Sequence, residues 1–372
     1  MGFAGVRLTT DEADETLQRV ADRLAPERPL LSASREEFNI LALSGGAAGG
    51  AFGAGVLVGL TRSGRRPPFA IVTGVSTGAL IAPFAFLGPA WDDQLEDAYL
   101  GGRAAKLMSL TRLGPMFGSG VFNGESLEAL VDPFVNEAMI EAIAAEHRKG
   151  RRLLVATTNL DTQRTSVWDM GAIAQVGGPE AVRMFRDVMI ASATLPGLFP
   201  PKLIDVEWQG ERFQEMHVDG GVSVPLFVMP DALLRWKNLG KRLRNSRVYV
   251  IVNTTLDQAP RSTQPNTPAI LARSFDTMLR FSYRRALSIA ASFCASHRLP
   301  LSVAVMPPSA EGFMMKFDTP TLRQIFDVAV ERAAGDELWA TPVPGPPTLD
   351  TALTWIRDVK RLAAMKTEAA GK

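Results

Sequence analysis

A serine stands between two glycines in the segment GVSTGAL, which contains the pattern Gly-x-Ser-x-Gly at Gly74, Ser76 and Gly78. The apolar run before this segment is typical of a buried strand, and the run after it is typical of a helix. A sharp turn from strand to helix exposes a serine hydroxyl, and flanking glycines remove steric clashes at such a turn. The N-terminus of the helix also favours negative charge that develops beside the serine. The segment predicts a nucleophilic serine, and a tight turn with an incidental serine is the alternative.

A glycine-rich loop, LSGGAAGGAFGAG, precedes this serine by one strand and one helix and occupies residues 43–55. Loops of this kind direct backbone N–H groups at an anion. A P-loop is excluded because no Gly-Lys-Ser/Thr follows, and the order of the glycines is not that of a dinucleotide-binding loop. Since adjacent parallel strands place their following loops at one edge of a sheet, the segment is a candidate oxyanion hole for Ser76. Close packing of a helix on a strand is the plainer alternative.

A nucleophilic serine needs a base, and HVDGG (217–221) offers a carboxylate at the end of an expected strand. An aspartate in water has a pKa near ~3.9 and is a poor base, but burial raises it toward a useful value. Asp219 is therefore a candidate base, with an ordinary turn as the alternative. The histidines are weaker candidates, since two of them stand at expected helix ends and the third lies on the strand of Asp219. They are His147, His217 and His297.

Composition excludes several other classes of function. The chain has 372 residues, with 40 Lys and Arg against 39 Asp and Glu, so its bulk charge does not indicate a nucleic-acid partner. Cys294 is the one cysteine, which excludes an internal disulfide framework and a zinc site built from cysteines. With so few histidines as well, we expect neither a metal nor a cofactor.

Two uncharged stretches, Ile40–Leu60 and Phe69–Ala90, are long enough for a transmembrane hairpin. Each begins with residues typical of a strand and then changes character at glycine, which favours a buried strand followed by a helix. We therefore expect no transmembrane span. Residues 1–30 contain no signal peptide, which favours a cytoplasmic location or a peripheral one at a membrane. Secretion is the alternative if Met1 is not the natural start.

The order of expected elements indicates an α/β fold. A strand over 38–43, a helix over 50–63, a strand over 69–74 and a helix over 77–87 give the order β-α-β-α, which implies a parallel sheet. Further strands are expected over 152–160 and 247–253, and a hairpin over 202–218. We predict a helical N-terminal extension (1–37), one α/β hydrolase domain (38–340), and a linker with a C-terminal helix (341–372).

Four segments in this order, LSGGAAGGAFGAG, GVSTGAL, ASATLPGLFPP and DGG, resemble the patatin-like phospholipases. The resemblance covers roughly residues 38–255 and implies a three-layer α/β/α sandwich with a central, mostly parallel sheet and extra helices. It also implies a Ser-Asp dyad without histidine and hydrolysis of acyl esters of membrane lipids without calcium. By this resemblance the site residues are the nucleophile Ser76, the base Asp219, the oxyanion-hole residues Gly45, Gly46 and Ala47, the elbow glycines Gly74 and Gly78, and the DGG glycines Gly220 and Gly221.

The chain departs from the family pattern at two positions. Ala47 stands where the family usually has a third glycine, and Gly49 stands where it has Arg or Lys. If position 47 needs a positive φ, the alanine strains one donor of the oxyanion hole. From the resemblance we expect a phospholipase A that contacts the membrane surface transiently. The alternatives are a small-molecule carboxylesterase or thioesterase on the same site, and a catalytically weak lipid-binding protein.

Overall fold

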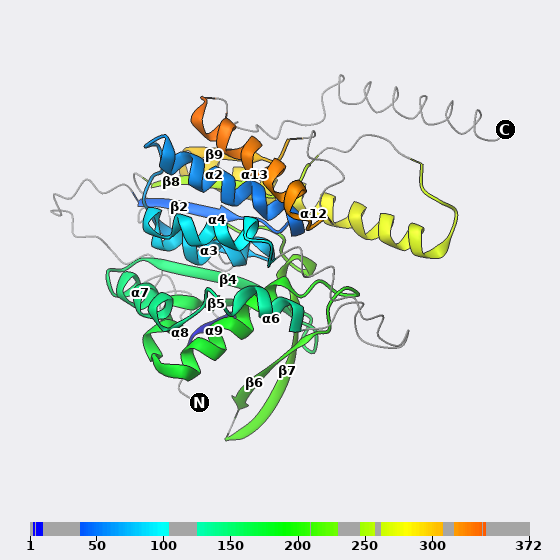
Figure 1. Ribbon diagram of the computed structural model, residues 1–372. Coiled ribbons are helices and arrows are strands. Elements are labelled where there is room, and N and C mark those ends of the chain that lie inside the picture. The colour runs from blue at the N-terminus through cyan, green and yellow to red at the C-terminus, as the bar shows by residue number, and fades with distance from the viewer. Residues whose placement is uncertain are drawn as a thin grey trace.

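The protein was analysed as a computed structural model, which describes residues 3, 5–9, 38–103, 125–208, 210–229, 246–256, 262–307, 316–336 and 338–339. Within these residues, one sheet of nine strands forms the centre of the molecule (Figure 1). The strands are β1 (Arg7–Thr9), β2 (Phe38–Leu43), β3 (Phe69–Val75), β4 (Arg152–Asn159), β5 (Arg164–Asp169), β6 (Lys202–Trp208), β7 (Glu211–Asp219), β8 (Ser246–Val252) and β9 (Leu301–Val305).

The sheet is parallel at its centre and antiparallel at one side. Its order is β1-β5-β4-β3-β2-β8-β9, and β4, β3, β2, β8 and β9 run parallel. Strand β5 pairs antiparallel with β4, β1 pairs antiparallel with β5, and the β6–β7 hairpin joins β4 through β7. The parallel strands are almost wholly apolar because both of their faces are covered.

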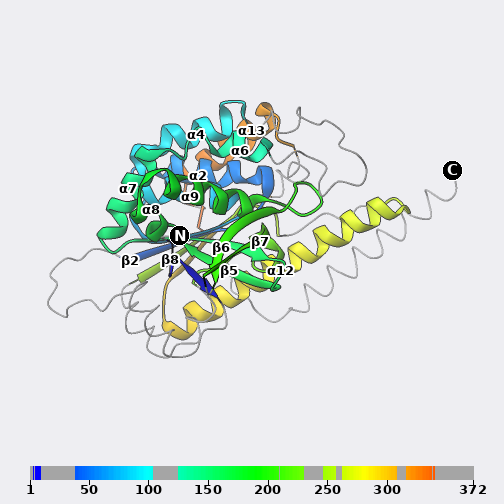
Figure 2. The ribbon, with the colours of Figure 1, turned by 90° about the horizontal axis from the view of Figure 1, so that it is seen from below.

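Most of the helices lie on one face of the sheet, and α12 lies on the other (Figure 2). The first layer contains α2 (Gly50–Arg62), α3 (Thr77–Leu87), α4 (Asp92–Leu100), α6 (Glu125–Val131), α7 (Glu137–Arg148), α8 (Met170–Val176), α9 (Gly178–Ala193) and α13 (Thr319–Ala334). Helix α12 (Thr267–His297) is the long helix of the opposite layer. Side chains alternate along the strands, as Leu41 contributes to the core under the first layer and Ile40 to the core under α12. The expected three-layer α/β/α sandwich is thereby confirmed.

The two uncharged stretches are strand–helix units, β2 with α2 and β3 with α3, and not a membrane hairpin. Among the described helices, none combines the length and hydropathy that crossing a bilayer requires. Arg7–Thr9, within the predicted N-terminal extension, is a strand of the sheet. The rest of the predicted N-terminal extension, residues 10–37, and the linker and helix expected over 341–372 lie outside the described residues.

Candidate active site

Ser76 occupies a sharp turn between β3 and α3, as the sequence predicts. Its backbone has φ 56° and ψ −125°, a conformation that residues other than glycine rarely adopt. A Cβ atom at Gly74 would lie 2.6 Å from the carbonyl oxygen of Gly78, and a Cβ atom at Gly78 would lie 2.4 Å from that of Leu43. The two flanking glycines are therefore required by close packing of the turn against itself and against the end of β2.

The register of the sheet brings Ser76 and Asp219 together along one edge of β4, where β7 continues the pairing after β3 ends. Val75 pairs with Ala156 of β4, and the next residue of that strand, Thr157, pairs with Asp219. The Ser76 hydroxyl donates a hydrogen bond of 2.6 Å to Oδ2 of Asp219. This is the geometry of a nucleophile with an adjacent base.

Asp219 is fixed by its own turn and is almost fully buried. Its Oδ1 accepts a hydrogen bond of 2.7 Å from the backbone N–H of Gly221. Burial raises the pKa of the Asp219 carboxyl to about 6, while the hydrogen bonds from Ser76 and Gly221 oppose the rise. The expected direction of the shift is confirmed, and it brings the carboxylate closer to the range in which a general base works well.

The two DGG glycines have different roles in this turn. A Cβ atom at Gly220 would lie 2.4 Å from the carbonyl oxygen of Ala156, so only glycine fits beside β4. At Gly221 the nearest atom to an added Cβ would be Oδ1 of Asp219, at 3.0 Å, and the contribution of this residue is its backbone N–H.

Ser192, near the end of α9, supports the turn of Ser76. Its hydroxyl accepts a hydrogen bond of 3.0 Å from the backbone N–H of Ser76 and donates one of 2.7 Å to the carbonyl oxygen of Ala156. Sequence reasoning missed this residue and assigned no chemical group to the ASATLPGLFPP segment that contains it. A serine within a helix gives no local sign that its hydroxyl will join the turn of Ser76 to β4.

The glycine-rich loop after β2 lies beside this turn, but one of its three expected donors is already used. The backbone N–H of Gly45 donates a hydrogen bond of 3.1 Å to the carbonyl oxygen of Pro225. The Gly45 N–H is therefore engaged in this structure, and its contribution to an oxyanion hole stays a prediction. Within the described part of the chain, the N–H groups of Gly46 and Ala47 have no acceptor, because they precede or begin the 3-10 turn η1 (Ala47–Gly49).

Asn253, directly after β8, holds this loop in place. Its backbone N–H donates to Oγ of Ser44 at 2.8 Å, and its side-chain Nδ2 donates to the Ser44 carbonyl oxygen at 2.7 Å. The carbonyl oxygen of Asn253 also lies 2.0 Å from the position of a Cβ atom at Gly49 and 2.1 Å from that of one at Gly46. The glycine that replaces the family's basic residue is thus required by the approach of Asn253.

Ala47 adopts φ 50°, in the left-handed region. The position therefore uses the backbone conformation that a glycine would adopt without strain. An alanine in that conformation costs about 1–2 kcal/mol of stability. The loop adopts the conformation in spite of the methyl group.

None of the histidines is a hydrogen-bond partner of Ser76, whose hydroxyl is bonded to Asp219 and whose backbone N–H is bonded to Ser192. His217 is buried between Oγ1 of Thr157, 2.9 Å from its Nδ1, and the carboxylate of Glu215, 3.2 Å from its Nε2. His297 is bonded to the carbonyl oxygen of Phe293 at the end of α12. Nδ1 of His147 lies 3.6 Å from Oδ1 of Asp169.

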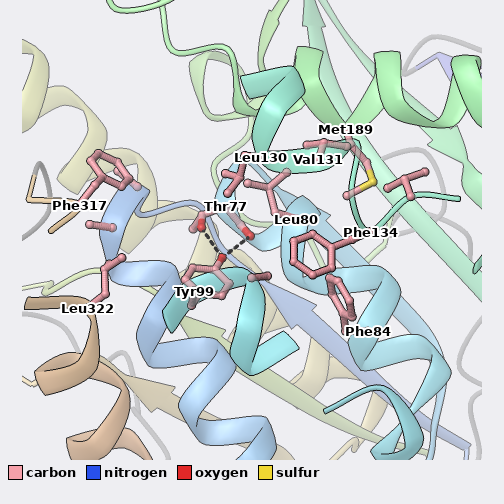
Figure 3. Close-up of a pocket in the computed structure, with 14 residues that line it drawn as sticks. Thr77, Leu80, Phe84, Tyr99, Leu130, Val131, Phe134, Met189, Phe317 and Leu322 are labelled. Carbon is pink, nitrogen blue, oxygen red and sulfur yellow. Dashed lines mark hydrogen bonds between the residues drawn. The ribbon is translucent and has the colours of Figure 1, made fainter. Parts of the chain in front are cut away.

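An apolar pocket opens beside the loop and the turn, in the helical layer above the sheet (Figure 3). Tyr99 closes one side of it, and its hydroxyl forms a hydrogen bond of 2.8 Å with the Thr77 hydroxyl. The lining is otherwise almost wholly aliphatic and aromatic. It consists of Ala47, Ala48, Thr77, Leu80, Phe84, Ala98, Tyr99, Leu130, Val131, Phe134, Val135, Met189, Phe317 and Leu322.

The described part of the chain contains no cluster of side chains suited to bind a metal ion. No group of three or more His, Cys, Asp or Glu side chains there is arranged to hold an ion. Within the same residues, the side chains gathered around Ser76 are a carboxylate, hydroxyls and apolar groups.

A mostly parallel α/β/α sandwich with a serine at a strand–turn–helix elbow defines an α/β protein of the hydrolase type. The sequence model of the patatin-like phospholipases matches residues 41–230, which are 190 of the 372 residues. The chain therefore belongs to the patatin-like phospholipase family, and it is a hydrolase of lipid esters.

Two solved structures are similar in chain course at low identity. VipD from Legionella pneumophila shares 11% identity with a TM-score of 0.33, over 79% of this chain and 67% of VipD. Human GIVD cytosolic phospholipase A2 shares 11% identity with a TM-score of 0.40, over 84% of this chain and 54% of the human one. The chain thus spans about half the length of the human protein. No curated protein sequence matches the chain.

Proposed function

We propose that the protein is a phospholipase A that cleaves fatty-acyl esters through a Ser76–Asp219 dyad and an acyl-enzyme. The observation that carries this proposal is the hydrogen bond of 2.6 Å from the Ser76 hydroxyl to the buried Asp219 carboxylate. Ser76 attacks the ester carbonyl while its proton passes to Asp219. The N–H groups of Gly46 and Ala47 stabilise the oxyanion.

The second half of the reaction uses the same groups. The alcohol leaves with the proton that Asp219 has taken up. Asp219 then removes a proton from water, which attacks the acyl-enzyme, and collapse of the second tetrahedral intermediate releases the fatty acid and returns the proton to Ser76. No step requires a histidine.

The apolar pocket supports the assignment of a long-chain acyl substrate. Its lining includes Ala47, which is itself a proposed oxyanion donor, and Thr77, which directly follows the nucleophile in the chain. An acyl chain bound there would bury its methylene groups against Leu80, Phe84 and Phe134 at about 0.8 kcal/mol each. A small polar ester would leave this lining without a partner.

A fluorophosphonate probe tests the mechanism, because it labels an activated serine quickly. We expect labelling of the native chain at Ser76, and none in Ser76→Ala. A native chain that binds fatty acid but is not labelled would be a lipid-binding protein without catalysis. Preference for long-chain phospholipids over short soluble esters and thioesters distinguishes the phospholipase from the alternative hydrolases.

We also propose that the N-terminal half of α12 contacts the lipid surface. This half extends away from the sheet (Figures 1 and 2), and it exposes Leu271 by 64%, Met278 by 68% and Phe281 by 64%. Exposed apolar side chains on a projecting helix are typical of an interaction site.

Vesicle flotation tests this contact. Leu271→Glu with Met278→Glu is expected to reduce binding to phosphatidylcholine vesicles several-fold, and cleavage of a soluble ester should not change. Val176→Glu, at an exposed apolar position on α8, is the matched control and should bind vesicles like the native chain. Unchanged flotation of the double variant would refute the role of α12.

A further inference from the structure

Tyr283 of α12 reaches the site from the face of the sheet opposite to the apolar pocket. A Cβ atom at Gly45 would lie 2.7 Å from the Tyr283 hydroxyl oxygen, 3.1 Å from Cβ of Ser76 and 3.7 Å from its Oγ. The tyrosine and serine hydroxyls therefore flank the same point beside Gly45. The tyrosine is 5% exposed, so its ring is held by packing.

Tyr283 is nearly buried as a residue, but its hydroxyl oxygen keeps some exposure, and no hydrogen bond joins it to another described residue. The other buried tyrosine of the site, Tyr99, is bonded to Thr77. Tyrosine hydroxyls in largely buried positions normally find a hydrogen-bond partner. A polar atom of a bound substrate would satisfy this hydroxyl.

The two sides of Ser76 differ in character, which decides which atom of the ester meets the tyrosine. The apolar pocket lies within the helical layer that contains α2 and α3, and α12 packs on the other face of the sheet. With the acyl chain in the pocket and the carbonyl oxygen toward Gly46 and Ala47, the alcohol part of the ester is directed to the α12 side. This step rests on the proposed function.

We propose that the Tyr283 hydroxyl donates a hydrogen bond to the alkoxy oxygen of the ester and stabilises the departing alcohol. When the tetrahedral intermediate collapses, the bond between the carbonyl carbon and the alkoxy oxygen breaks, and the oxygen gains the electron pair. Asp219, protonated by Ser76, transfers its proton to this oxygen, and Tyr283 keeps its own. Burial, followed by the nearby charge of Asp219, raises the pKa of Tyr283, so the phenol stays a donor throughout the working range of pH.

The leaving group provides the test. A strongly basic alkoxide needs a hydrogen-bond donor as it departs, and the weakly basic 4-nitrophenolate does not. We expect Tyr283→Phe to reduce kcat/KM for ethyl octanoate by ~10–10²-fold, within the usual worth of a positioned donor. For 4-nitrophenyl octanoate, which carries the same acyl chain, kcat/KM should change less than threefold. Labelling of Ser76 by a fluorophosphonate, which expels fluoride, should keep its native rate.

Tyr249→Phe is the matched control, since it removes a phenol hydroxyl from β8, where Tyr249 packs on Phe69 and Trp339 away from Ser76. It should leave the ratio of the two esters unchanged. An equal loss on both esters in Tyr283→Phe, or no loss on either, would overturn the leaving-group role and leave the dyad standing. A native chain that neither cleaves an ester nor is labelled at Ser76 would overturn the proposed function and this inference together.

Discussion

The Ser76 hydroxyl and the Asp219 carboxylate are hydrogen-bonded at 2.6 Å although 143 positions separate them in the chain. The pair forms because β3 and β7 pair with successive residues along the same edge of β4, β3 parallel to it and β7 antiparallel. Asp219 lies at the end of a strand that itself pairs with β4, so its carboxylate is held by the sheet and not by a flexible loop. In this account the sheet orients the base, as a third side chain would in a triad.

Asp219→Asn is expected to reduce ester cleavage by ~10²–10⁴-fold, the usual worth of a positioned base. The amide keeps the size of the carboxylate but cannot take the serine proton. The measurement is kcat/KM on a soluble ester. His147→Gln, His217→Gln and His297→Gln, each measured per folded molecule, are expected to remain within a few-fold of the native chain. If His297→Gln is as damaging as Asp219→Asn, a triad replaces the dyad.

The same substitution should not lower stability at pH 8. A folded-state pKa raised to about 6 means that the folded protein binds this proton more tightly than the unfolded chain does. The stability that Asp219 contributes is therefore present below its unfolded pKa, near ~3.9, and is lost as pH rises through about 6. Asp219→Asn removes a buried charge at pH 8, so its midpoint of thermal unfolding should equal or exceed that of the native chain. A large drop would show that the carboxylate stabilises the fold.

Activity should rise with pH in the acid range. The base must be ionised, so kcat/KM is expected to increase through an apparent pKa of about 6 and then level off. A profile of kcat/KM from pH 4 to pH 9 measures this limb. Persistence of full activity at pH 4.5 would mean that the group accepting the serine proton is not a buried carboxyl with a raised pKa.

Ala47 tests the oxyanion loop, because it adopts φ 50°. Ala47→Gly relieves a strain of about 1–2 kcal/mol, and the rate should rise or stay unchanged. Ala47→Val adds a β-branched side chain in the left-handed region and should cut turnover of a soluble ester ~10-fold or more through a misplaced donor. Unaltered turnover in Ala47→Val would remove this loop from the oxyanion hole.

Gly49→Arg restores the family's basic residue but is expected to damage the loop. A Cβ atom at this position would lie 2.0 Å from the carbonyl oxygen of Asn253, which also holds Ser44. The variant should lose most activity on neutral and anionic lipids alike, and its unfolding midpoint should drop. Gly335→Arg, where an added Cβ lies 3.7 Å from its nearest neighbour, is the control and should behave like the native chain. A gain in activity on anionic lipids in Gly49→Arg would contradict the steric argument.

Local patterns were enough to predict the strand–turn–helix around Ser76 and the carboxylate at the end of β7, because glycine requirements and apolar runs are local properties. Helix α3 begins and ends at Thr77 and Leu87, the residues predicted for it. The β6–β7 hairpin was equally visible from its turn. The hydrogen bond from the Gly45 N–H to the Pro225 carbonyl oxygen was not predicted, because Pro225 is 180 residues away and carries no mark of this contact.

Supporting residues were missed for the same reason. Ser192, Asn253 and Tyr283 act through hydrogen bonds or approaches to distant backbone, and each stands in a segment whose local pattern is that of ordinary helix or strand. The approach of the Asn253 carbonyl oxygen to Gly49 is likewise a property of tertiary packing, and the sequence does not show it. The positions of all these residues depend on contacts between helices, strands and loops that are remote from one another in the sequence.

Mass spectrometry of the products released from mixed phospholipids tests the central claim most directly, with the native chain and Ser76→Ala compared at equal concentration. The hydroxyl is small and contributes little to packing, so the variant should keep its fold and lose under ~1 kcal/mol of stability. We predict free fatty acids and lysophospholipids from the native chain and none above background from the folded variant. Full release of fatty acid by Ser76→Ala would contradict the serine mechanism.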